Sequence, residues 1–280
     1  MFAFLSKFFF KKGISLFAPI PLGSCRIQKP YLLERAEIRS GTVIMIAVPY
    51  FTKQCLDKKR NISCYAVSRD YHGFYRELFD ELLPLLKQNF PQYRFAGFAD
   101  HSPIAEIDAA ARAGLGAIGK NHLLITEPYS SFVFLGCLVT DAVIPCEAKP
   151  IKFCEACGKC ISSCPAKTPS DCLSALTQKK GALTDEEQQT ILRHGSAWGC
   201  DICQMICPHT VKAIRSETIY TTIPYFREQS LPCLTSEILD DMTEEAFASR
   251  AYAWRGRDTI KRNLILLETQ SQNKKGESSC

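Results

Sequence analysis

The sequence predicts a mixed α/β (α+β) domain on the N-terminal side, followed by a small cysteine-rich module. Two observations lead to this prediction. Strand-like and helix-like segments alternate up to about residue 145, and seven of the 15 cysteines lie in two compact clusters between residues 154 and 207. A length of 280 residues suits one or two domains with ordinary hydrophobic cores. We expect domains at residues 1–148 and 149–215, and a partly helical extension at 216–280.

The elements of the first domain follow from their apolar patterns. Thr42–Val48 is a β-branched apolar run ended by Pro49, which indicates a buried strand. Phe74–Asn89 places its leucines on one helical face, with Pro84 as a kink. The other expected elements are a strand at 93–98, an Ala-rich helix at 104–113 closed by Gly114, and strands at 122–126 and 132–140.

Two segments are expected later in the chain. Thr184 and Glu187 form a capping box that starts a helix running to about His194, with Gly195 as its end. The polar segment Ser271–Cys280 is predicted to be disordered.

Net charge and hydropathy exclude few classes of function. The net charge of +5 permits a nucleic-acid partner without requiring one. No apolar run approaches the ~18 residues that cross a bilayer, so no membrane partner is expected. Lys7 interrupts the apolar run Met1–Phe10, so this segment is expected to pack on the domain and not to act as a secretory signal.

The cysteine spacing indicates two iron–sulfur clusters. The runs are Cys154-x2-Cys157-x2-Cys160-x3-Cys164-Pro165 and Cys200-x2-Cys203-x3-Cys207-Pro208. In ferredoxin-like modules three thiolates of such a run hold one [4Fe–4S] cube and the fourth crosses to the other. Two cubes need eight thiolates, so Cys172 is the nearest candidate for the eighth. The expected ligands are Cys154, Cys157, Cys160 and Cys207 for cluster 1, and Cys164, Cys172, Cys200 and Cys203 for cluster 2.

Zinc and disulfides are the competing interpretations of these cysteines. Zinc sites rarely use a third cysteine at x2 followed by x3-Cys-Pro, and disulfide frameworks suit short secreted domains. The remaining cysteines are scattered along the sequence. We expect each of them to be buried and to pack as a small hydrophobic residue. So many unpatterned thiols suit a reducing cytoplasm. They are Cys25, Cys55, Cys64, Cys137, Cys146, Cys233 and Cys280. Cys146 or another of these stays open as the eighth ligand.

Six segments together resemble a known family. They are Arg-Asp-Tyr-His at 69–72, Ala-Asp-His-Ser-Pro-Ile at 99–104, Ala-Gly-Leu-Gly-Ala-Ile-Gly-Lys-Asn at 113–121, Ser-Phe-Val-Phe-Leu-Gly at 131–136, Thr-Asp at 140–141 and Gly-Cys-Asp-Ile-Cys-Gln at 199–204. In this order they resemble epoxyqueuosine reductase, a cobalamin- and iron–sulfur-dependent family of tRNA modification. The resemblance is close over roughly residues 40 to 210 and suggests a short, divergent member.

The resemblance implies reduction of epoxyqueuosine to queuosine at the tRNA wobble position. Electrons would pass from a flavodoxin or ferredoxin through the two [4Fe–4S] clusters to base-off cob(II)alamin, and Asp100 would be the proton donor. The protein would be a cytoplasmic monomer that binds the tRNA anticodon stem-loop. The residues implied to contact cobalamin are Tyr71, His72, Asp100, Gly119, Lys120, Asn121, Ser131 and Asp141.

Each of these residues also has an ordinary structural interpretation. Asp100 suits an N-cap for the Ala-rich helix, whereas a carboxyl acid needs an apolar environment to hold its proton near neutrality. Tyr71 suits a half-buried aromatic and His72 a satisfied polar residue. Gly114, Gly116 and Gly119 suggest a close approach of the backbone to something flat or anionic. Their spacing follows a helix, which excludes a dinucleotide fingerprint.

A late segment mixes cations and aromatics as single-stranded RNA surfaces do. Its members are Arg250, Tyr252, Trp254, Arg255, Arg257, Lys261 and Arg262, and an exposed basic helix is the plain alternative. Two other functions stay open. One is a corrinoid iron–sulfur reductase of a small molecule, as in reductive dehalogenation, because the C-terminal repeats of longer family members are not seen here. The other is a non-catalytic ferredoxin-type carrier, which the segments before residue 145 disfavour.

Overall fold

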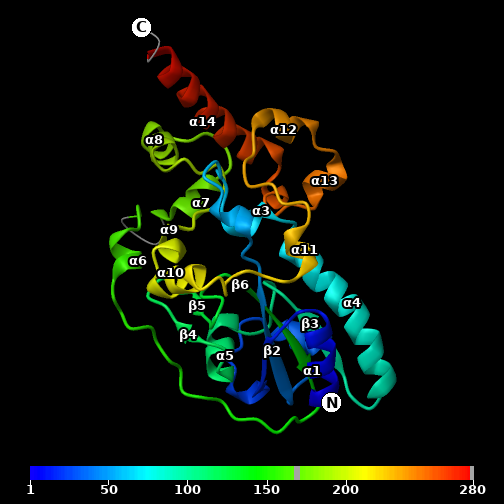
Figure 1. Ribbon diagram of the computed structural model, residues 1–280. Helices are drawn as coiled ribbons and strands as arrows, with labels where there is room; N and C mark the ends of the chain where they lie inside the picture. Colours follow the sequence, from blue (N-terminus) through cyan, green and yellow to red (C-terminus); the bar gives the residue numbers. More distant parts are fainter. Residues whose placement is uncertain (167–170, 278–280) are drawn as a thin grey trace. The chain divides into compact units, whose positions relative to one another are not determined.

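The computed structural model describes residues 1–166 and 171–277, with side chains up to residue 270. The chain forms two compact units (Figure 1), each built from separate stretches. Unit 1 comprises Met1–Phe51, Tyr71–Gly158 and Cys207–Ile223. Unit 2 comprises Thr52–Asp70, Lys159–Ile206 and Pro224–Cys280. The stretches of the two units therefore alternate along the chain.

Unit 1 is built on a four-stranded sheet in the order β1-β2-β6-β3. The strands are β1 (Leu16–Pro21), β2 (Thr42–Pro49), β3 (Phe95–Phe98) and β6 (Val133–Thr140). β2 is buried along its whole length, which confirms the predicted buried strand. Every pairing in this sheet is antiparallel, so the domain is of the α+β kind. Alternating strands and helices favour a parallel sheet, but alternation fixes the order of elements and leaves strand direction open.

The helices of unit 1 largely match the predicted ones. α4 (Tyr71–Asn89) contains Pro84, and α5 (Glu106–Ala113) ends at Gly114, which has a left-handed φ of 86°. α1 (Phe2–Lys11) buries Leu5 and Phe9, so the N-terminal segment does pack on the domain. The remaining elements are α2 (Pro30–Arg35), the hairpin β4 (Ala117–Ile118) and β5 (Leu124–Ile125), and α10 (Pro208–Arg215).

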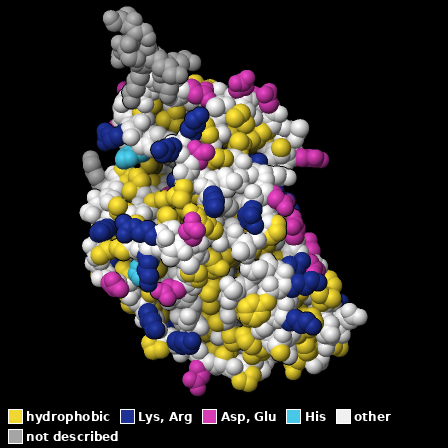
Figure 2. Space-filling model, in the orientation of Figure 1, with side chains coloured by type: hydrophobic (Ala, Val, Ile, Leu, Met, Phe, Trp, Pro, Cys, Tyr) yellow, Lys and Arg dark blue, Asp and Glu magenta, His cyan; other side chains and the backbone are white. Residues whose placement is uncertain are grey.

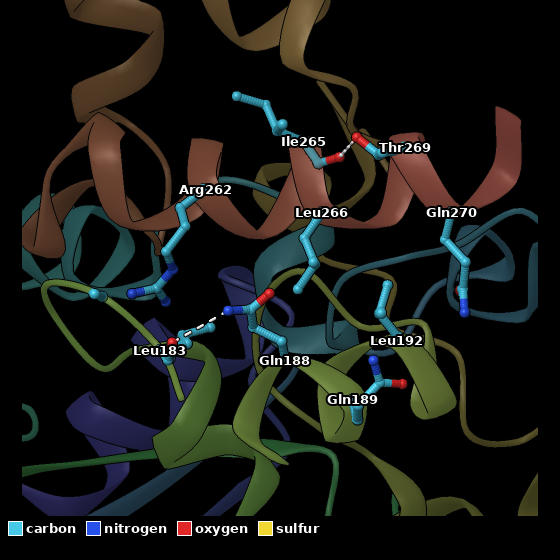
Figure 3. A pocket seen from close by; sticks show the side chains of 10 residues that line it. Leu183, Gln188, Gln189, Leu192, Arg262, Ile265, Leu266, Thr269 and Gln270 are labelled. Atoms are coloured by element: carbon cyan, nitrogen blue, oxygen red, sulfur yellow. Dashed lines mark hydrogen bonds between the residues drawn. The ribbon is translucent and has the colours of Figure 1, made fainter. Parts of the chain in front are cut away.

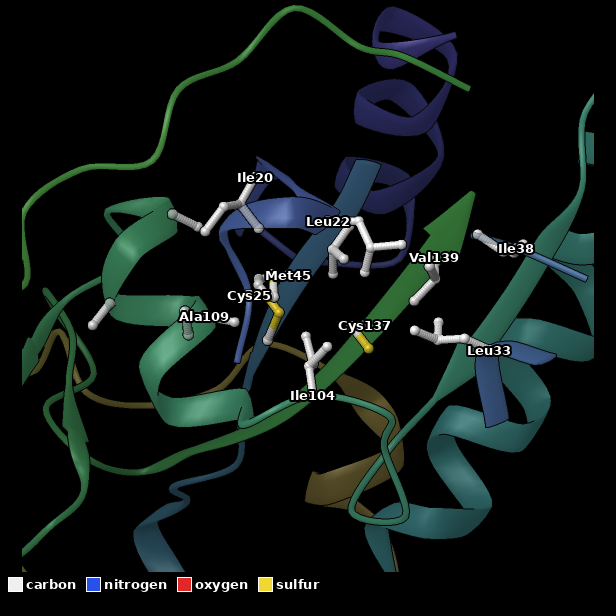
Figure 4. Packing of buried hydrophobic residues seen from close by; sticks show 14 of the residues in the cluster. Ile20, Leu22, Cys25, Leu33, Ile38, Met45, Ile104, Ala109, Cys137 and Val139 are labelled. Atoms are coloured by element: carbon white, nitrogen blue, oxygen red, sulfur yellow. The ribbon is translucent and has the colours of Figure 1, made fainter. Parts of the chain in front are cut away.

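One face of the sheet carries a hydrophobic cluster (Figure 4). Met45 of β2 and Val139 of β6 meet Ile104 and Ala109 from the α5 region. Cys137 lies in the same cluster with no exposed surface, and burial raises the pKa of its thiol. Its role is therefore that of a small buried hydrophobe, as the sequence predicts for scattered cysteines.

Unit 2 consists of short helices and one long helix. Its helices are α3 (Cys64–Val67), α6 (Lys159–Ser162), α7 (Leu173–Thr177), α8 (Asp185–His194), α9 (Ile202–Met205), α11 (Pro224–Arg227), α12 (Ser236–Asp241), α13 (Glu244–Ala248) and α14 (Arg257–Glu277). α8 confirms the capping box, because the Glu187 N–H donates to Thr184 Oγ1 at 3.3 Å and the Thr184 N–H donates to Glu187 Oε2 at 2.9 Å. None of the helices in the described part of the chain is long and apolar enough to cross a membrane.

The long helix α14 is fixed to the rest of unit 2 by a buried amide. Asn263 Nδ2 donates to the carbonyl oxygens of Thr177 and Ala197, both at 2.8 Å. The helix runs to Glu277, so it includes most of the segment for which disorder is predicted, and residues 278–280 lie outside the described part. An anchored helix extends through polar residues because each added residue contributes one more hydrogen bond.

A substitution at Gly136 of β6 tests how the sheet packs against Tyr75 of α4. A Cβ there would lie 2.5 Å from Tyr75 Cε1, and the Tyr75 hydroxyl donates to Phe134 O at 3.0 Å. We expect Gly136→Ala to lower the free energy of unfolding by about 1–3 kcal/mol in urea denaturation, as overpacking does. Gly23→Ala, which meets no atom within 4 Å, is the control and should be near neutral. Equal effects of the two substitutions would contradict this packing.

Candidate functional site

Three of the predicted site residues come together beside the start of β6. The ring of Tyr71 stacks on Phe134, with centroids 4.2 Å apart and planes 10° apart, and Tyr50 stacks on Phe134 at 4.1 Å. His72 lies against Tyr71 at 4.1 Å, and its Nε2 is 3.7 Å from Asp100 Oδ2. The sequence interpretation missed Tyr50 and Phe134, although Phe134 lies inside a segment that carried the resemblance.

Asp100 is displayed by a tight loop and does not cap α5. The N-cap of that helix is Ala105, which makes no side-chain capping bond. Asp100 has a left-handed φ of 61°, and its side chain is 69% exposed. The Ser102 N–H donates to Asp100 O at 3.0 Å and closes the turn. The interpretation of Asp100 as an N-cap is therefore wrong, and its carboxyl is available to a ligand.

The Asp100 loop is fixed from one side by His101. Lys29 Nζ lies 3.0 Å from His101 Nδ1, and the Tyr31 hydroxyl lies 2.8 Å from His101 Nε2. An ammonium group only donates, so Nδ1 is the acceptor and a neutral ring carries its hydrogen on Nε2. His101 thus links the loop to the segment that begins α2.

Gly119, Lys120 and Asn121 form the turn between β4 and β5. The Gly119 N–H donates to Leu123 O at 2.8 Å, and a Cβ on Gly119 would overlap the Asn121 side chain. Gly116 likewise packs against the backbone of Ile125, and Gly114 ends α5. Gly114 thus serves the helix end and Gly116 packing within the chain, and their approach to a flat or anionic ligand stays a prediction.

This hairpin lies directly beside the first cysteine of cluster 1. The Ile118 N–H donates to Lys152 O at 2.8 Å, and the Cys154 N–H donates to Ile118 O at 3.0 Å. Both segments belong to unit 1, as does the Asp100 loop. A backbone ladder thus connects the cysteine run to the turn at Gly119–Asn121.

Ser131 and Asp141 lie at opposite ends of β6. Ser131 is buried and comes just before the strand. Asp141 follows the strand and accepts from the Arg94 backbone N–H at 2.8 Å and from Arg94 Nη1 at 3.3 Å. At about 3.4 Å per residue, Asp141 is roughly 24 Å from Phe134. The structure therefore does not bring Asp141 to the other predicted contacts.

The predicted cluster ligands differ from the other cysteines in exposure. All eight are partly or fully exposed, whereas Cys25, Cys55, Cys64 and Cys137 are buried. Cys154, Cys157 and Cys207 belong to unit 1, and the other five belong to unit 2. No three Cys, His, Asp or Glu side chains of the described residues converge as ligands of one ion.

Cys172 lies close enough to Cys200, the first cysteine of the second run, for its charge to affect the Cys200 thiol. Burial raises the pKa of the Cys200 thiol to about 11, and the charges of Asp201, Cys203 and Cys172 raise it as well. Cys172 is also the N-cap residue of α7. Its position therefore suits the eighth ligand.

Asp201 anchors the second run within unit 2. Its carboxylate is 5% exposed and accepts from the Cys64 N–H at 2.8 Å and from Arg60 Nη1 at 2.6 Å. The Ser63 hydroxyl is a third donor to it. Sequence reasoning gave Asp201 no role, although it lies in the Gly-Cys-Asp-Ile-Cys-Gln segment.

The predicted RNA segment is mostly used inside unit 2. Arg250 and Tyr252 are buried, and Arg257 donates to Leu239 O and Met242 O. Lys261 pairs with Asp240 at 2.7 Å. The expected broad surface is therefore reduced mainly to one aromatic–cation pair: Trp254 is 61% exposed, and the guanidinium of the partly buried Arg255 lies 3.8 Å from its ring centroid. On the face shown in Figure 2, basic and acidic side chains are interspersed.

Arg262 instead lines a groove between α8 and α14 (Figure 3), with a volume of about 630 Å³. Its guanidinium donates to Lys179 O at 2.9 Å, and Leu183, Leu192 and Leu266 give the groove an apolar wall. The groove contains none of the predicted catalytic, cobalamin or cluster residues. We therefore place the candidate site at Tyr71, His72 and Asp100.

Comparison with known proteins identifies the family. The family model described as epoxyqueuosine reductase QueG, DUF1730, matches residues 35–101. Epoxyqueuosine reductase of Lactococcus garvieae is 30% identical over 262 residues, covering 86% of this chain and 71% of that protein. The Listeria monocytogenes enzyme is 32% identical over 253 residues, covering 85% of this chain and 66% of that protein. The chain thus spans about two thirds of the length of these relatives.

Solved structures of epoxyqueuosine reductases have a fold similar to that of this chain. Epoxyqueuosine reductase from Streptococcus thermophilus superposes with a TM-score of 0.73 at 24% identity, covering 95% of this chain and 80% of that one. An epoxyqueuosine reductase with an epoxyqueuosine-modified tRNA-Tyr stem loop gives 0.74 at 23% identity, with the same coverage. With the sequence relationship above, these matches show that the chain belongs to the epoxyqueuosine reductase family, oxidoreductases of tRNA queuosine processing.

Proposed function

We propose that this protein reduces epoxyqueuosine to queuosine at the wobble position of tRNA. The observation that carries the proposal is the backbone pairing of Cys154 with Ile118, in the same unit that displays Asp100. It joins the first predicted ligand of cluster 1, by backbone hydrogen bonds, to the unit that holds the candidate site. Family membership supplies the substrate, and it disfavours the small-molecule reductase and the simple electron carrier.

The residues present fit the two kinds of cofactor that the family implies. Seven partly or fully exposed thiols in the ferredoxin spacing, with Cys172 as the eighth, suit two [4Fe–4S] clusters. The partly buried ring of Tyr71, supported by the buried rings of Phe134 and Tyr50 and next to an exposed carboxyl, suits a flat corrinoid with an apolar face. When bound, base-off cobalamin would supply a strongly reducing metal centre. Gly119–Asn121 and Ser131 remain proposed contacts.

Asp100 is the proposed proton donor. Reduction of the epoxide to an alkene consumes two electrons and two protons, and the epoxide oxygen leaves as water. The oxygen leaves poorly as an alkoxide, so a positioned acid accelerates the step by about 10²–10⁴-fold. Asp100 would donate that proton, with His72 Nε2 3.7 Å from its carboxyl oxygen Oδ2.

The tRNA partner has a candidate contact in Trp254 and Arg255. An exposed ring that already stacks on a guanidinium is a platform for an unstacked base of the anticodon loop. We also propose a cytoplasmic monomer that receives electrons from a flavodoxin or ferredoxin.

The cluster assignment predicts the iron content. Protein purified anaerobically should hold about eight irons per chain, and Cys172→Ser should lose roughly four of them. Cys146→Ser, at a similarly exposed cysteine, is the control and should keep all eight. If iron analysis finds the loss of four irons only in Cys146→Ser, the eighth ligand is Cys146. Purified wild-type protein that contains zinc and no iron would refute the iron–sulfur clusters.

The acid role predicts a selective loss of turnover. Asp100→Asn should bind cobalamin normally, seen as base-off cob(II)alamin by EPR, while turnover falls about 10²–10⁴-fold. Turnover is measured by mass spectrometry of tRNA nucleosides. Asp80→Asn, on an exposed face of α4, should keep full activity. Unchanged turnover in Asp100→Asn would remove this residue from the chemistry.

The RNA contact predicts a local effect on binding. Trp254→Ala should weaken binding of a tRNA anticodon stem-loop by about 1–3 kcal/mol, the contribution of one stacked base. Fluorescence anisotropy measures the Kd. Phe10→Ala, another aromatic that is 60% exposed, should leave the Kd unchanged. If both variants bind equally well, Trp254 makes no contact with the RNA.

A further inference from the structure

Asn263 of α14 joins two segments that carry predicted ligands of cluster 2. Its side chain has no exposed surface, and its Nδ2 donates to Thr177 O and to Ala197 O, both at 2.8 Å. Thr177 ends α7, the helix whose N-cap is Cys172. Ala197 lies three residues before Cys200. One buried amide of unit 2 therefore bridges the segment of Cys172 and the segment of Cys200.

The two segments also contact each other directly. The Gly199 N–H donates to Thr177 Oγ1 at 2.8 Å. Leu173 of α7 packs in one hydrophobic cluster with Cys200 and with Leu266 of α14. The neighbours of both cysteines are thus held by hydrogen bonds and by apolar packing.

The bridge lies at the base of a long insertion. Residues 178–196, which include α8, separate the two segments and carry none of the predicted cluster ligands. Bringing the ends of such a stretch together costs conformational entropy. The two hydrogen bonds of Asn263 are made just before and just after the insertion, so they offset this cost where the cysteines need it.

The orientation of the Asn263 amide is fixed by its neighbour Arg262. The Arg262 guanidinium donates to Asn263 Oδ1 through Nε at 3.1 Å and through Nη2 at 2.9 Å. A guanidinium only donates, so the oxygen of the amide faces Arg262 and its two N–H hydrogens face the two carbonyls. Every hydrogen of the amide nitrogen is therefore used in the bridge.

We propose that Asn263 is a positioning residue for cluster 2, which keeps the segments of Cys172 and Cys200 together as ligands of one [4Fe–4S] cube. Residues that do not touch the metal but fix its ligands commonly decide how well a site holds its metal. The contacts of the Asn263 side chain include none of the predicted ligands of cluster 1. The role rests on the proposed function and deepens it.

Removal of the amide should release cluster 2 and spare cluster 1. Asn263→Ala, purified anaerobically, should hold about four irons in place of eight, and the integrated EPR signal of the reduced clusters should fall by about half. Glu268→Ala is the matched control on the same helix. Glu268 accepts from the Ser236 N–H at 2.7 Å and from the Ser236 hydroxyl at 2.6 Å, so its loss removes two hydrogen bonds of α14 that lead to α12. This control should keep about eight irons.

Amide hydrogen exchange separates positioning from the loss of the cluster itself. Cys172→Ser should also lack cluster 2, but it keeps the Asn263 bridge. The peptides that contain residues 171–177 and 196–203 should therefore exchange at least about tenfold faster in Asn263→Ala than in Cys172→Ser.

Thr177→Val gives a milder test should Asn263→Ala fail to fold. Valine has nearly the shape of threonine but cannot accept the Gly199 N–H. A chelator should remove the irons of cluster 2 about 2–10-fold faster than from wild type, the factor for one hydrogen bond. Thr190→Val, which removes a hydroxyl bonded to Glu186 O within α8, should leave this rate unchanged.

Three outcomes would overturn the role. They are about eight irons in Asn263→Ala, an equal loss of iron in Glu268→Ala, and equal exchange of residues 196–203 in Asn263→Ala and Cys172→Ser. Iron and exchange are measured without tRNA. Wild-type enzyme that holds eight irons but does not convert epoxyqueuosine would therefore reject the proposed reaction and leave the role of Asn263 standing.

Discussion

The pairing of β2 with β6 is the constraint on which the candidate site depends. β2 is buried along its length, and its antiparallel register with β6 places Val48 opposite Phe134. The Tyr75 hydroxyl, donating to Phe134 O at 3.0 Å, fixes α4 to the same end of β6. Tyr71 therefore begins α4 where its ring can stack on Phe134, and His72 reaches the Asp100 loop. A shift of one residue in this register would turn Phe134 to the other face of the sheet.

A second set of backbone contacts fixes the cysteine runs. Cys154 is held by Ile118, and the run from Cys200 begins beside Asp201, whose buried carboxylate is satisfied by Arg60, Ser63 and the Cys64 N–H. A buried charge is tolerated only when its partners are complete. These donors fix the position of Asp201 beside Cys200.

Local patterns predicted local structure well. The capping box at Thr184, the proline inside α4, the end of α5 at Gly114 and the buried strand at 42–49 all depend on neighbours along the chain. Other features depend on residues that are far away in sequence, so periodicity could not reveal them. They are the direction of the strands, the ion pair of Asp141 with Arg94 and the burial of Arg250. Glu106 shows the same limit. It begins α5, where an acid suits the helix N-terminus, and only the fold reveals the burial that raises the pKa of its carboxyl.

Conversion of the RNA substrate tests the central claim most directly. Holoenzyme with both clusters and cobalamin is incubated anaerobically with a strong reductant and tRNA containing epoxyqueuosine, and the nucleosides are analysed by mass spectrometry. The account predicts that the modified nucleoside loses one oxygen and becomes queuosine, and that the product requires all three components. Complete recovery of epoxyqueuosine from enzyme with full iron and bound cobalamin would contradict it.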